Sequence, residues 1–274
     1  DEREYAHAVA KATHATCRDV PFGQDDFNTL LPQIAAYMDD PVADYAILPT
    51  WKLAAVAATE QKVILSGEGG DELFAGYGRY RPRWWKARWW KDMWSFQKQA
   101  ENGRFSSKWS RLQCAQAQDI AEYLPNDLLV KLDTCLMAHG LEGRTPFLDP
   151  VVADFAFTLP DDLKLRGRTG KYLLKAWLDT RLPEAQAFRR KQGFTVPVGT
   201  WMADMGLPLA TVLSDHPFVK EILTREDIGN LPMRLSSPDE AARCWSLLYL
   251  TLWAVGKQTT SENGTILERL ADRT

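Results

Sequence analysis

The sequence lacks the features that mark membrane, secreted and disulfide-rich proteins. No apolar run reaches membrane-spanning length, and the first four residues, three acids and one arginine, are too charged for a secretory signal. The cysteines are few and far apart, without the close pairs typical of zinc sites or disulfide scaffolds: Cys17, Cys114, Cys135 and Cys244. We therefore expect a cytoplasmic protein that has no membrane partner.

The sequence also lacks an excess of charge of either sign and a convergent set of histidines. Lys and Arg number 33 and Asp and Glu number 36, so the net charge of −3 gives no global attraction to nucleic acid or to an anionic membrane. His7 and His14 can share one helix face, but the pattern offers them no third ligand, and His139 and His216 lie far away. We therefore predict no nucleic-acid partner and no transition-metal site.

What the chain does have is abundant helix-favouring sequence. Its 274 residues, 45% of them hydrophobic and 25% charged, suffice for one large domain or two small ones with real cores. The clearest strand is Val63–Leu65, an apolar run that a Ser-Gly pair stops, and a weaker strand is predicted within residues 15–20. Because helical patterns surround these strands, we predict an α/β part in residues 1–80 and a helical part in residues 81–274.

The chain opens on a segment with a helical pattern. In an α/β domain, the first helix normally follows a strand. We therefore expect the first strand of the parallel layer to be missing from this chain, so that the sheet is truncated.

A short loop after the clearest strand combines glycine with acid. Residues 66–70 read Ser-Gly-Glu-Gly-Gly and lead into a helix that starts with Asp71 and Glu72. Such a loop presents backbone amides at the carboxyl edge of a parallel sheet, where ligands bind. Its acids would repel bare phosphate, but a magnesium ion held by Asp71 would reverse that sign.

A second interpretation needs no ligand. The glycines form a tight turn, and the two acids favour the dipole of the helix by about 0.3 to 1 kcal/mol each. Glycine-rich turns before helices are common, so the spacing alone leaves both interpretations open.

Residues 66–80, which continue from the loop into Phe-Ala-Gly-Tyr-Gly-Arg-Tyr, resemble the signature loop of asparagine synthetases and their relatives. Those relatives include β-lactam synthetases and amidotransferases that modify peptides or sugars. A match of this length is far more specific than a lone glycine motif. The likeness extends from residue 1 to about residue 205. Four other stretches resemble family segments in the expected order: residues 39–50, 133–149, 170–175 and 189–194.

The resemblance implies a fold and a reaction. The fold would be a truncated parallel sheet of the ATP-pyrophosphatase (adenine nucleotide α hydrolase-like) type, followed by a mostly helical region. The reaction would activate a carboxylate, aspartate or a related acid, by attack on the α-phosphate of ATP, after which ammonia displaces AMP. The implied cofactors are ATP and Mg²⁺, and the implied partner is an amino-terminal glutaminase domain or subunit that releases ammonia from glutamine. The acceptor acid stays open, and so does assembly as a homodimer.

The resemblance also assigns roles to two lysines. Lys191 matches the family's catalytic lysine, which would stabilise the activated phosphate and later the oxyanion, with Arg189 and Arg190 beside it. Lys171 resembles the lysine that holds pyrophosphate. Composition alone would favour solvated lysines at both positions.

Within the loop, the resemblance assigns three residues. Ser66 and Gly67 match positions that contact the nucleotide. Glu68 matches a catalytic residue linked to forming the adenylate and to taking a proton from incoming ammonium.

The chain departs from the family pattern in two places. It has no Ser-Gly-Gly-x-Asp-Ser loop before its first helix, and no glutaminase domain, whose nucleophile is the first cysteine. We therefore expect a fragment, a split subunit or a degenerate protein, inactive by itself because oriented groups supply on the order of 7 to 11 kcal/mol of barrier reduction. Asp133 and Arg144 are left out of the predicted site, because a buried ion pair explains them as well as substrate contact does.

Two further alternatives stay open. In a different ATP pyrophosphatase, residues 66–71 would themselves wrap pyrophosphate, although Glu68 and Glu72 stand where that loop needs a glycine and a hydroxyl. In a non-catalytic fragment, residues 79–96 would bind a membrane surface or single-stranded nucleic acid, because arginine and lysine alternate there with tryptophan. A helix packed through its tryptophans is the simpler explanation: Trp84, Trp85, Trp89, Trp90 and Trp94.

Overall fold

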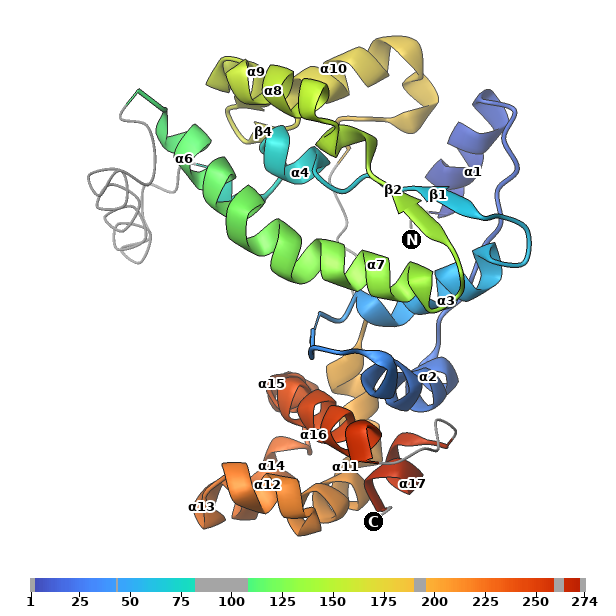
Figure 1. Cartoon of the computed structure of the whole chain (residues 1–274), viewed down its shortest axis with the longest axis vertical. Helices are drawn as coiled ribbons and strands as arrows, with labels where there is room; N and C mark the ends of the chain where they lie inside the picture. Colours follow the sequence, from blue (N-terminus) through green and yellow to red (C-terminus); the bar gives the residue numbers. More distant parts are fainter. Residues whose placement is uncertain (1–2, 43, 82–107, 190–195, 259–263, 272–274) are drawn as a thin grey trace. The chain divides into compact units, whose positions relative to one another are not determined.

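A computed structural model describes residues 3–42, 44–81, 108–189, 196–258 and 264–271 (Figure 1). The chain forms two compact units, and each is discontinuous in sequence. Unit 1 contains Asp1–Asp19, Val63–Val130 and Glu142–Gln192, and unit 2 contains Val20–Lys62, Lys131–Leu141 and Gly193–Thr274. In the described ranges, no helix is long and apolar enough to cross a membrane.

The described part of the chain is mostly helical with a small parallel sheet, which confirms the predicted α/β class in this coarse form. The ATP-pyrophosphatase type of the sheet and the division at residue 80 stay predictions. The Trp-rich stretch lies outside the described residues, so its competing interpretations stay open.

The parallel sheet of unit 1 has two strands in the described residues. The predicted strand β1 (Val63–Leu65) is confirmed, and it pairs in register with β2 (Glu142–Arg144), so that Leu65 faces Arg144. The weaker strand predicted within residues 15–20 is wrong, because that segment forms no ladder in the described chain. A second, antiparallel pair joins β3 (Leu165–Arg166) to β4 (Thr169–Gly170).

Two helices of unit 1, α6 and α8, begin at side chains that cap them. Ser110 and Gln113 form a capping box at the start of α6, and the Asp149 carboxylate accepts the Val151 N–H at the start of α8. The π-helix η2 continues directly from α6. The helical elements of this unit are α1 (Arg3–Ala12), α4 (Gly70–Leu73), η1 (Gly78–Tyr80), α6 (Arg111–Gln118), η2 (Asp119–Leu129), η3 (Pro146–Leu148), α8 (Pro150–Thr158), α9 (Asp161–Lys164), α10 (Tyr172–Arg181) and η4 (Pro183–Ala185).

The apolar core of unit 1 forms around the short helix α4. Leu73 and Phe74 are buried with Ala156 of α8, and Phe147 and Leu148 pack against them. Figure 1 shows α4 beside α8, in agreement with the contacts between the two helices. This apolar packing fixes α4, and with it the end of the glycine-rich loop, because each Å² of buried apolar surface stabilises the fold by about 25 cal/mol.

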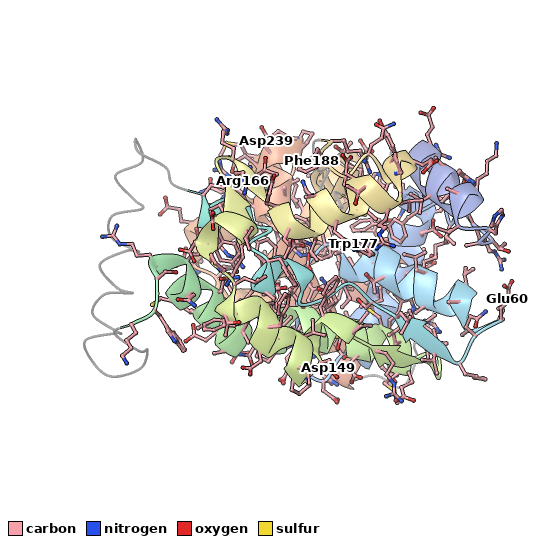
Figure 2. The ribbon with its side chains drawn as sticks, turned by 90° about the horizontal axis from the view of Figure 1, so that it is seen from above. Glu60, Asp149, Arg166, Trp177, Phe188 and Asp239 are labelled. Atoms are coloured by element: carbon pink, nitrogen blue, oxygen red, sulfur yellow. The ribbon has the colours of Figure 1, made fainter. Side chains whose placement is uncertain are left out.

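Aromatic side chains at the surface of unit 1 gather on α10 and just after η4. Trp177 is 59% exposed and Phe188 is 45% exposed (Figure 2). The Phe188 ring lies 6.1 Å from that of Tyr172, and the Arg166 guanidinium carbon lies 3.9 Å from the Tyr172 ring centre.

Unit 2 is a helical cluster in its described residues. Its core is built mainly where α2 packs on α16 and α11 packs on α15, and a β-carbon on Gly256 would lie only 2.5 Å from the Ala36 backbone. Lys131, which is 6% exposed, forms an ion pair of 2.5 Å with Asp44. The helices are α2 (Gln24–Tyr37), α3 (Ile47–Ala57), α7 (Val130–Met137), α11 (Val198–Asp215), α12 (Pro217–Ile222), α13 (Arg225–Gly229), α14 (Leu231–Arg234), α15 (Pro238–Arg243), α16 (Trp245–Gln258) and α17 (Ile266–Ala271).

Candidate functional site

The loop predicted to bind a nucleotide follows β1 in unit 1. The Ser66 N–H donates to the Arg144 carbonyl at 2.8 Å, which extends the β1–β2 pairing by one step. Gly69 then turns the chain into α4 with φ of 86°, a value that side chains disfavour. A β-carbon on Gly69 would also lie 2.3 Å from Cδ2 of Leu148. Glycine is therefore required here for both the turn and the close packing.

The front of this loop is accessible. The Ser66 hydroxyl accepts the Glu68 N–H at 3.3 Å, and both residues are half-buried. Gly67 is exposed, and a β-carbon there would meet nothing within 4 Å. A ligand can therefore approach the backbone at Gly67, as its predicted role requires.

Asp71 and Lys171 are brought together although one hundred residues separate them in the sequence. The Lys171 ammonium nitrogen lies 3.0 Å from Oδ1 of Asp71, and the two side chains are 28% and 20% exposed. Gly76 leaves room for this ion pair, because a β-carbon on Gly76 would lie 1.7 Å from the same carboxylate oxygen. The predicted metal ligand and the predicted pyrophosphate lysine therefore share one half-open site.

The backbone around Lys171 is strained. Lys171 precedes α10 with φ of 54° and ψ of 33°, a left-handed conformation that costs a residue other than glycine about 1 to 3 kcal/mol. Its N–H donates to the Phe74 carbonyl at 2.9 Å. Beside it, a β-carbon on Gly170 would lie 2.1 Å from the Ala75 carbonyl oxygen. These contacts fix the start of α10 directly against the end of α4.

Glu72 lies on the inner side of α4, in an environment that the sequence did not predict. Its side chain is 1% exposed, and Oε1 accepts the Tyr77 hydroxyl at 2.6 Å. Burial, followed by the Glu72 carboxylate, raises the pKa of Tyr77 well above its usual value, so the phenol stays protonated. Oε2 of Glu72 has no hydrogen-bond partner in the described structure. One clue was available, because a residue that follows an outward-facing acid on a helix is rotated by about 100° toward the core.

A buried polar pair beneath α4 also escaped prediction. Gln116 is fully buried, and its amide nitrogen donates to the carbonyls of Glu72 at 2.6 Å and Leu73 at 2.7 Å. Lys164 is also fully buried and donates to Oε1 of Gln116 at 3.2 Å. Burial lowers the pKa of Lys164 to about 8, and the nearby Asp161 offsets this in part. The spacing offered one signal, since Gln116 lies four residues after the buried Leu112 on the same helix face.

The carboxyl end of the signature segment is anchored separately. Asp119 accepts hydrogen bonds from the Arg79 guanidinium at 2.9 Å and from the Tyr80 hydroxyl. The Arg79 guanidinium carbon also lies 4.1 Å from the centre of the Tyr77 ring. A pocket of about 450 Å³ opens beside these residues, and neither the glycine-rich loop nor Lys171 lines it. Its lining residues are Arg79, Gln118, Asp119, Glu122, Tyr123, Asn126 and Asp127. We therefore do not assign the nucleotide to this pocket.

Other predicted residues lie apart from this site or outside the described chain. Lys191 and Arg190 are outside the described residues, and the Arg189 guanidinium carbon lies 3.9 Å from the Tyr5 ring centre. The interpretation of Asp133 and Arg144 as a buried ion pair is wrong. Arg144 is exposed and pairs with Glu142 at 2.8 Å, and Asp133 is exposed. Both residues are polar because they face solvent.

The donor set of the loop suits a hard cation and phosphate. Asp71 supplies carboxylate oxygens at a half-open position, and Lys171 supplies an ammonium within 3.0 Å of them. Magnesium uses one or two carboxylates together with phosphate oxygens, and it does not need nitrogen or sulfur ligands. The residues present therefore fit Mg²⁺ with a nucleotide, with Asp71 as the protein ligand and Lys171 beside the phosphates.

Comparison with known proteins gives a consistent picture. The family model described as asparagine synthase matches residues 1–255. The "Putative asparagine synthetase (glutamine-hydrolyzing)" of Mycobacterium tuberculosis is 29% identical over 90% of this chain and 47% of its own length. Asparagine synthetase (glutamine-hydrolyzing) 1 of Bacillus subtilis is 30% identical over 65% of the chain and 37% of its own length. Asparagine synthetase B of Escherichia coli is 26% identical over 78% of the chain and 35% of its own length.

The chain thus spans less than half of the length of each of these relatives. The family match, by contrast, covers nearly all of the chain, including the glycine-rich loop and Lys171. The chain belongs to the asparagine synthase family.

Proposed function

We propose that this chain supplies part of an ATP-dependent synthetase site that adenylates a carboxylate and transfers ammonia to it. The observation that carries the proposal is the ion pair between Lys171 and Asp71, which lies in the first turn of α4 directly after the glycine-rich loop. A carboxylate and an ammonium at the carboxyl edge of a parallel sheet match the two needs of a magnesium nucleotide, a metal ligand and a phosphate partner.

Charge balance supports this assignment. Without a ligand, Lys171 pairs with Asp71, so neither of these two partly buried charges is left without an opposite charge beside it. With a nucleotide bound, Asp71 would hold Mg²⁺ and the Lys171 ammonium would turn to the pyrophosphate part of ATP. Mg²⁺ would supply charge stabilisation at the phosphates, and each preplaced cationic group contributes several kcal/mol in a site closed to water.

The remaining loop residues would serve the reacting atoms. The Ser66 hydroxyl and the exposed Gly67 backbone would contact the nucleotide, because they form the open side of the loop. Glu68, half-buried beside them, would accept a proton from incoming ammonium. Lys191 keeps its predicted role of stabilising the activated phosphate and the later oxyanion.

The finer parts of the proposal rest on relatives. The names of the bacterial relatives describe glutamine-hydrolysing asparagine synthetases. We therefore propose aspartate as the first acid to test and ammonia released from glutamine as the nitrogen source. A glutaminase domain or subunit would be the partner that releases this ammonia.

Two variants test the assignment of the ion pair. In the complete protein, Asp71→Asn and Lys171→Gln should each lower Mg²⁺-dependent ATP–pyrophosphate exchange with aspartate by about 100-fold or more, because each removes one preplaced charge. Both variants should stay folded, since a partly exposed ion pair stabilises by less than about 1 kcal/mol. Binding of ATP with Mg²⁺ should weaken in parallel, as measured by calorimetry.

The matched controls are Asp154→Asn and Lys62→Gln, which make the same chemical changes at exposed positions outside the loop. They should leave exchange and nucleotide binding unchanged. Equal activity in the Asp71→Asn variant and its Asp154→Asn control would contradict the proposed function. In the complete protein, Lys191→Ala should also abolish exchange while leaving glutamine hydrolysis largely intact.

A further inference from the structure

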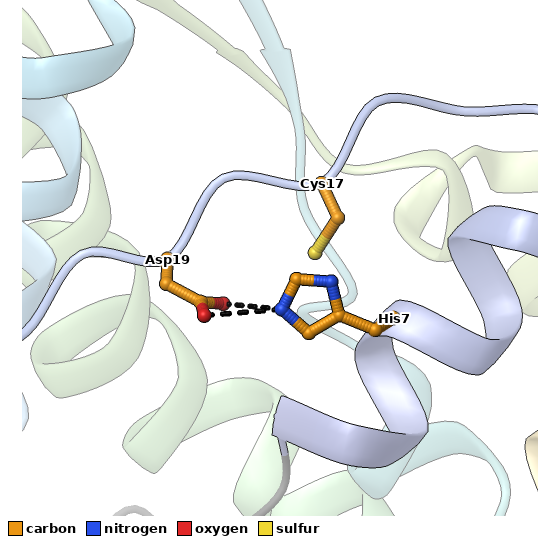
Figure 3. Close-up of side chains that lie close together, drawn as sticks. All are labelled: His7, Cys17 and Asp19. Atoms are coloured by element: carbon orange, nitrogen blue, oxygen red, sulfur yellow. Dashed lines mark hydrogen bonds and ion pairs between the residues drawn. The ribbon is translucent and has the colours of Figure 1, made fainter.

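Three side chains that can bind a metal meet beside α1, apart from the glycine-rich loop. His7 of α1 offers an imidazole, and the segment that follows α1 offers the thiol of Cys17 and the carboxylate of Asp19 (Figure 3). One ligand atom from each residue lies within 4.8 Å of the other two. Figure 3 shows the Asp19 carboxylate directed at an imidazole nitrogen and the Cys17 sulfur beside the same ring.

The local fold explains why these residues meet. After α1, His14 adopts a left-handed conformation with φ of 55°, and the Ala15 N–H donates back to the Ala10 carbonyl at 2.8 Å. This turn carries the segment with Cys17 and Asp19 to His7. The sequence pattern offered His7 and His14 no third ligand on their helix face. This turn instead brings Cys17 and Asp19 to His7 from outside the helix.

The distances suit a tetrahedral ion after small side-chain movements. His7 Nε2 lies 3.0 Å from one Asp19 carboxylate oxygen and 3.1 Å from the other. Zinc bonds of about 2.0 to 2.3 Å in a tetrahedron place neighbouring ligand atoms about 3.3 to 3.8 Å apart. The imidazole and carboxylate side chains are 51% and 40% exposed, so they can rotate through this range without disturbing a core.

The ligand types select the class of ion. A nitrogen, a sulfur and an oxygen together suit Zn²⁺ and similar borderline ions, whereas Mg²⁺ and Ca²⁺ prefer oxygen alone. Cys17 is also the one cysteine of the chain that is not buried. A thiolate and a carboxylate would together balance the charge of a divalent ion.

We infer that His7, Cys17 and Asp19 form a binding site for a borderline divalent cation such as Zn²⁺, with solvent at a fourth position. Binding deprotonates the Cys17 thiol, and the proton leaves to solvent. The bound ion replaces the His7–Asp19 hydrogen bond and joins α1 to the segment after it. This inference is independent of the proposed nucleotide site.

Cobalt titration tests the site, because Co²⁺ replaces Zn²⁺ in such ligand sets and is coloured. The purified protein, held in a thiol-free reductant, should bind one Co²⁺ per chain with a thiolate-to-cobalt absorption band in the near ultraviolet. Zn²⁺ should displace it and should slow alkylation of Cys17. Cys17→Ser should lose the band, and His7→Ala and Asp19→Asn should weaken binding by at least about 10- to 100-fold, the range that losing a mere outer partner of a metal ligand causes.

The matched controls are His14→Asn, which removes the imidazole but keeps a residue that tolerates the left-handed conformation, and Asp25→Asn at an exposed position of α2; both should leave the titration unchanged. Circular dichroism of each variant separates loss of binding from loss of folding. Absence of the near-ultraviolet band in the wild-type protein would overturn the inference. Binding of equal strength in the wild type and in the folded His7→Ala and Asp19→Asn variants would overturn it as well.

Discussion

Replacing Gln116 by leucine should loosen the helix that carries the glycine-rich loop. The Gln116 amide donates to the carbonyls of Glu72 and Leu73. Because α4 ends at Leu73, no following turn of this helix supplies N–H donors for these carbonyls. Leucine has a similar size but no hydrogen-bond donor, so both buried carbonyls would lose the hydrogen bonds that Gln116 gives them. The Lys164 ammonium would also lose its Gln116 partner at 3.2 Å.

The magnitude follows from the number of groups left without a partner. A buried polar group that loses its partner costs about 1 to 3 kcal/mol, so two carbonyls give about 2 to 6 kcal/mol. The added apolar side chain offsets roughly 1 kcal/mol of this. We therefore expect α4 to open about 1 to 5 kcal/mol more easily, which raises amide hydrogen exchange in residues 70–76 by about 5-fold or more.

Hydrogen exchange measured by mass spectrometry checks this value, with Gln118→Leu as the control. Gln118 lies on the same helix, but its amide nitrogen bonds only to Glu122 at 3.1 Å, so its loss should cost less than about 0.5 kcal/mol. Exchange in residues 70–76 that stays at the wild-type rate in Gln116→Leu would refute the reasoning. An equal increase in both variants would refute it too.

Three further predictions concern stability. Burial lowers the Lys164 pKa from 10.5 to about 8, so between these pH values the unfolded chain binds the proton more tightly than the folded chain. The free energy of unfolding should therefore rise from pH 8 to pH 10.5 by up to about 3 kcal/mol. Denaturant titrations of Lys164→Met should show no such rise. Gly76→Ala should expel the Asp71 carboxylate from its place, because a β-carbon would lie 1.7 Å from Oδ1; we expect about 1 to 3 kcal/mol of destabilisation in thermal unfolding and weaker binding of ATP with Mg²⁺. Lys131→Ala should destabilise unit 2 by about 2 kcal/mol in denaturant titrations, less than the 3 to 5 kcal/mol of a fully buried pair because Asp44 is 28% exposed; an unchanged midpoint would contradict this.

The sequence predicted the strand that its own side chains favour and missed the one that depends on a partner. Val63–Leu65 is apolar and β-branched in part, so it was identified correctly. β2 reads Glu-Gly-Arg, which has no strand preference, and it exists because its backbone pairs with β1. Residues 15–20 show the opposite case, because a favourable local pattern forms no strand without a neighbour in the described chain.

The candidate site was predictable where residues follow a motif and not where they meet through folding. Asp71 was assigned from the chemistry of magnesium and Lys171 from resemblance to a family, and only the structure shows their contact at 3.0 Å. Gln116 and Lys164 were missed because polar residues are normally placed at the surface. The sequence did not predict that Cys17 lies beside His7, because cysteine spacing alone does not show that a turn brings the two residues together.

The left-handed backbone at Lys171 has a practical consequence for protein engineering. Glycine at this position would remove a strain of about 1 to 3 kcal/mol, so a search for sturdier variants would favour it strongly. The same substitution deletes the ammonium that faces Asp71. Thermal stability and the proposed nucleotide binding therefore favour different residues at this position, and Lys171 should be kept when the protein is stabilised.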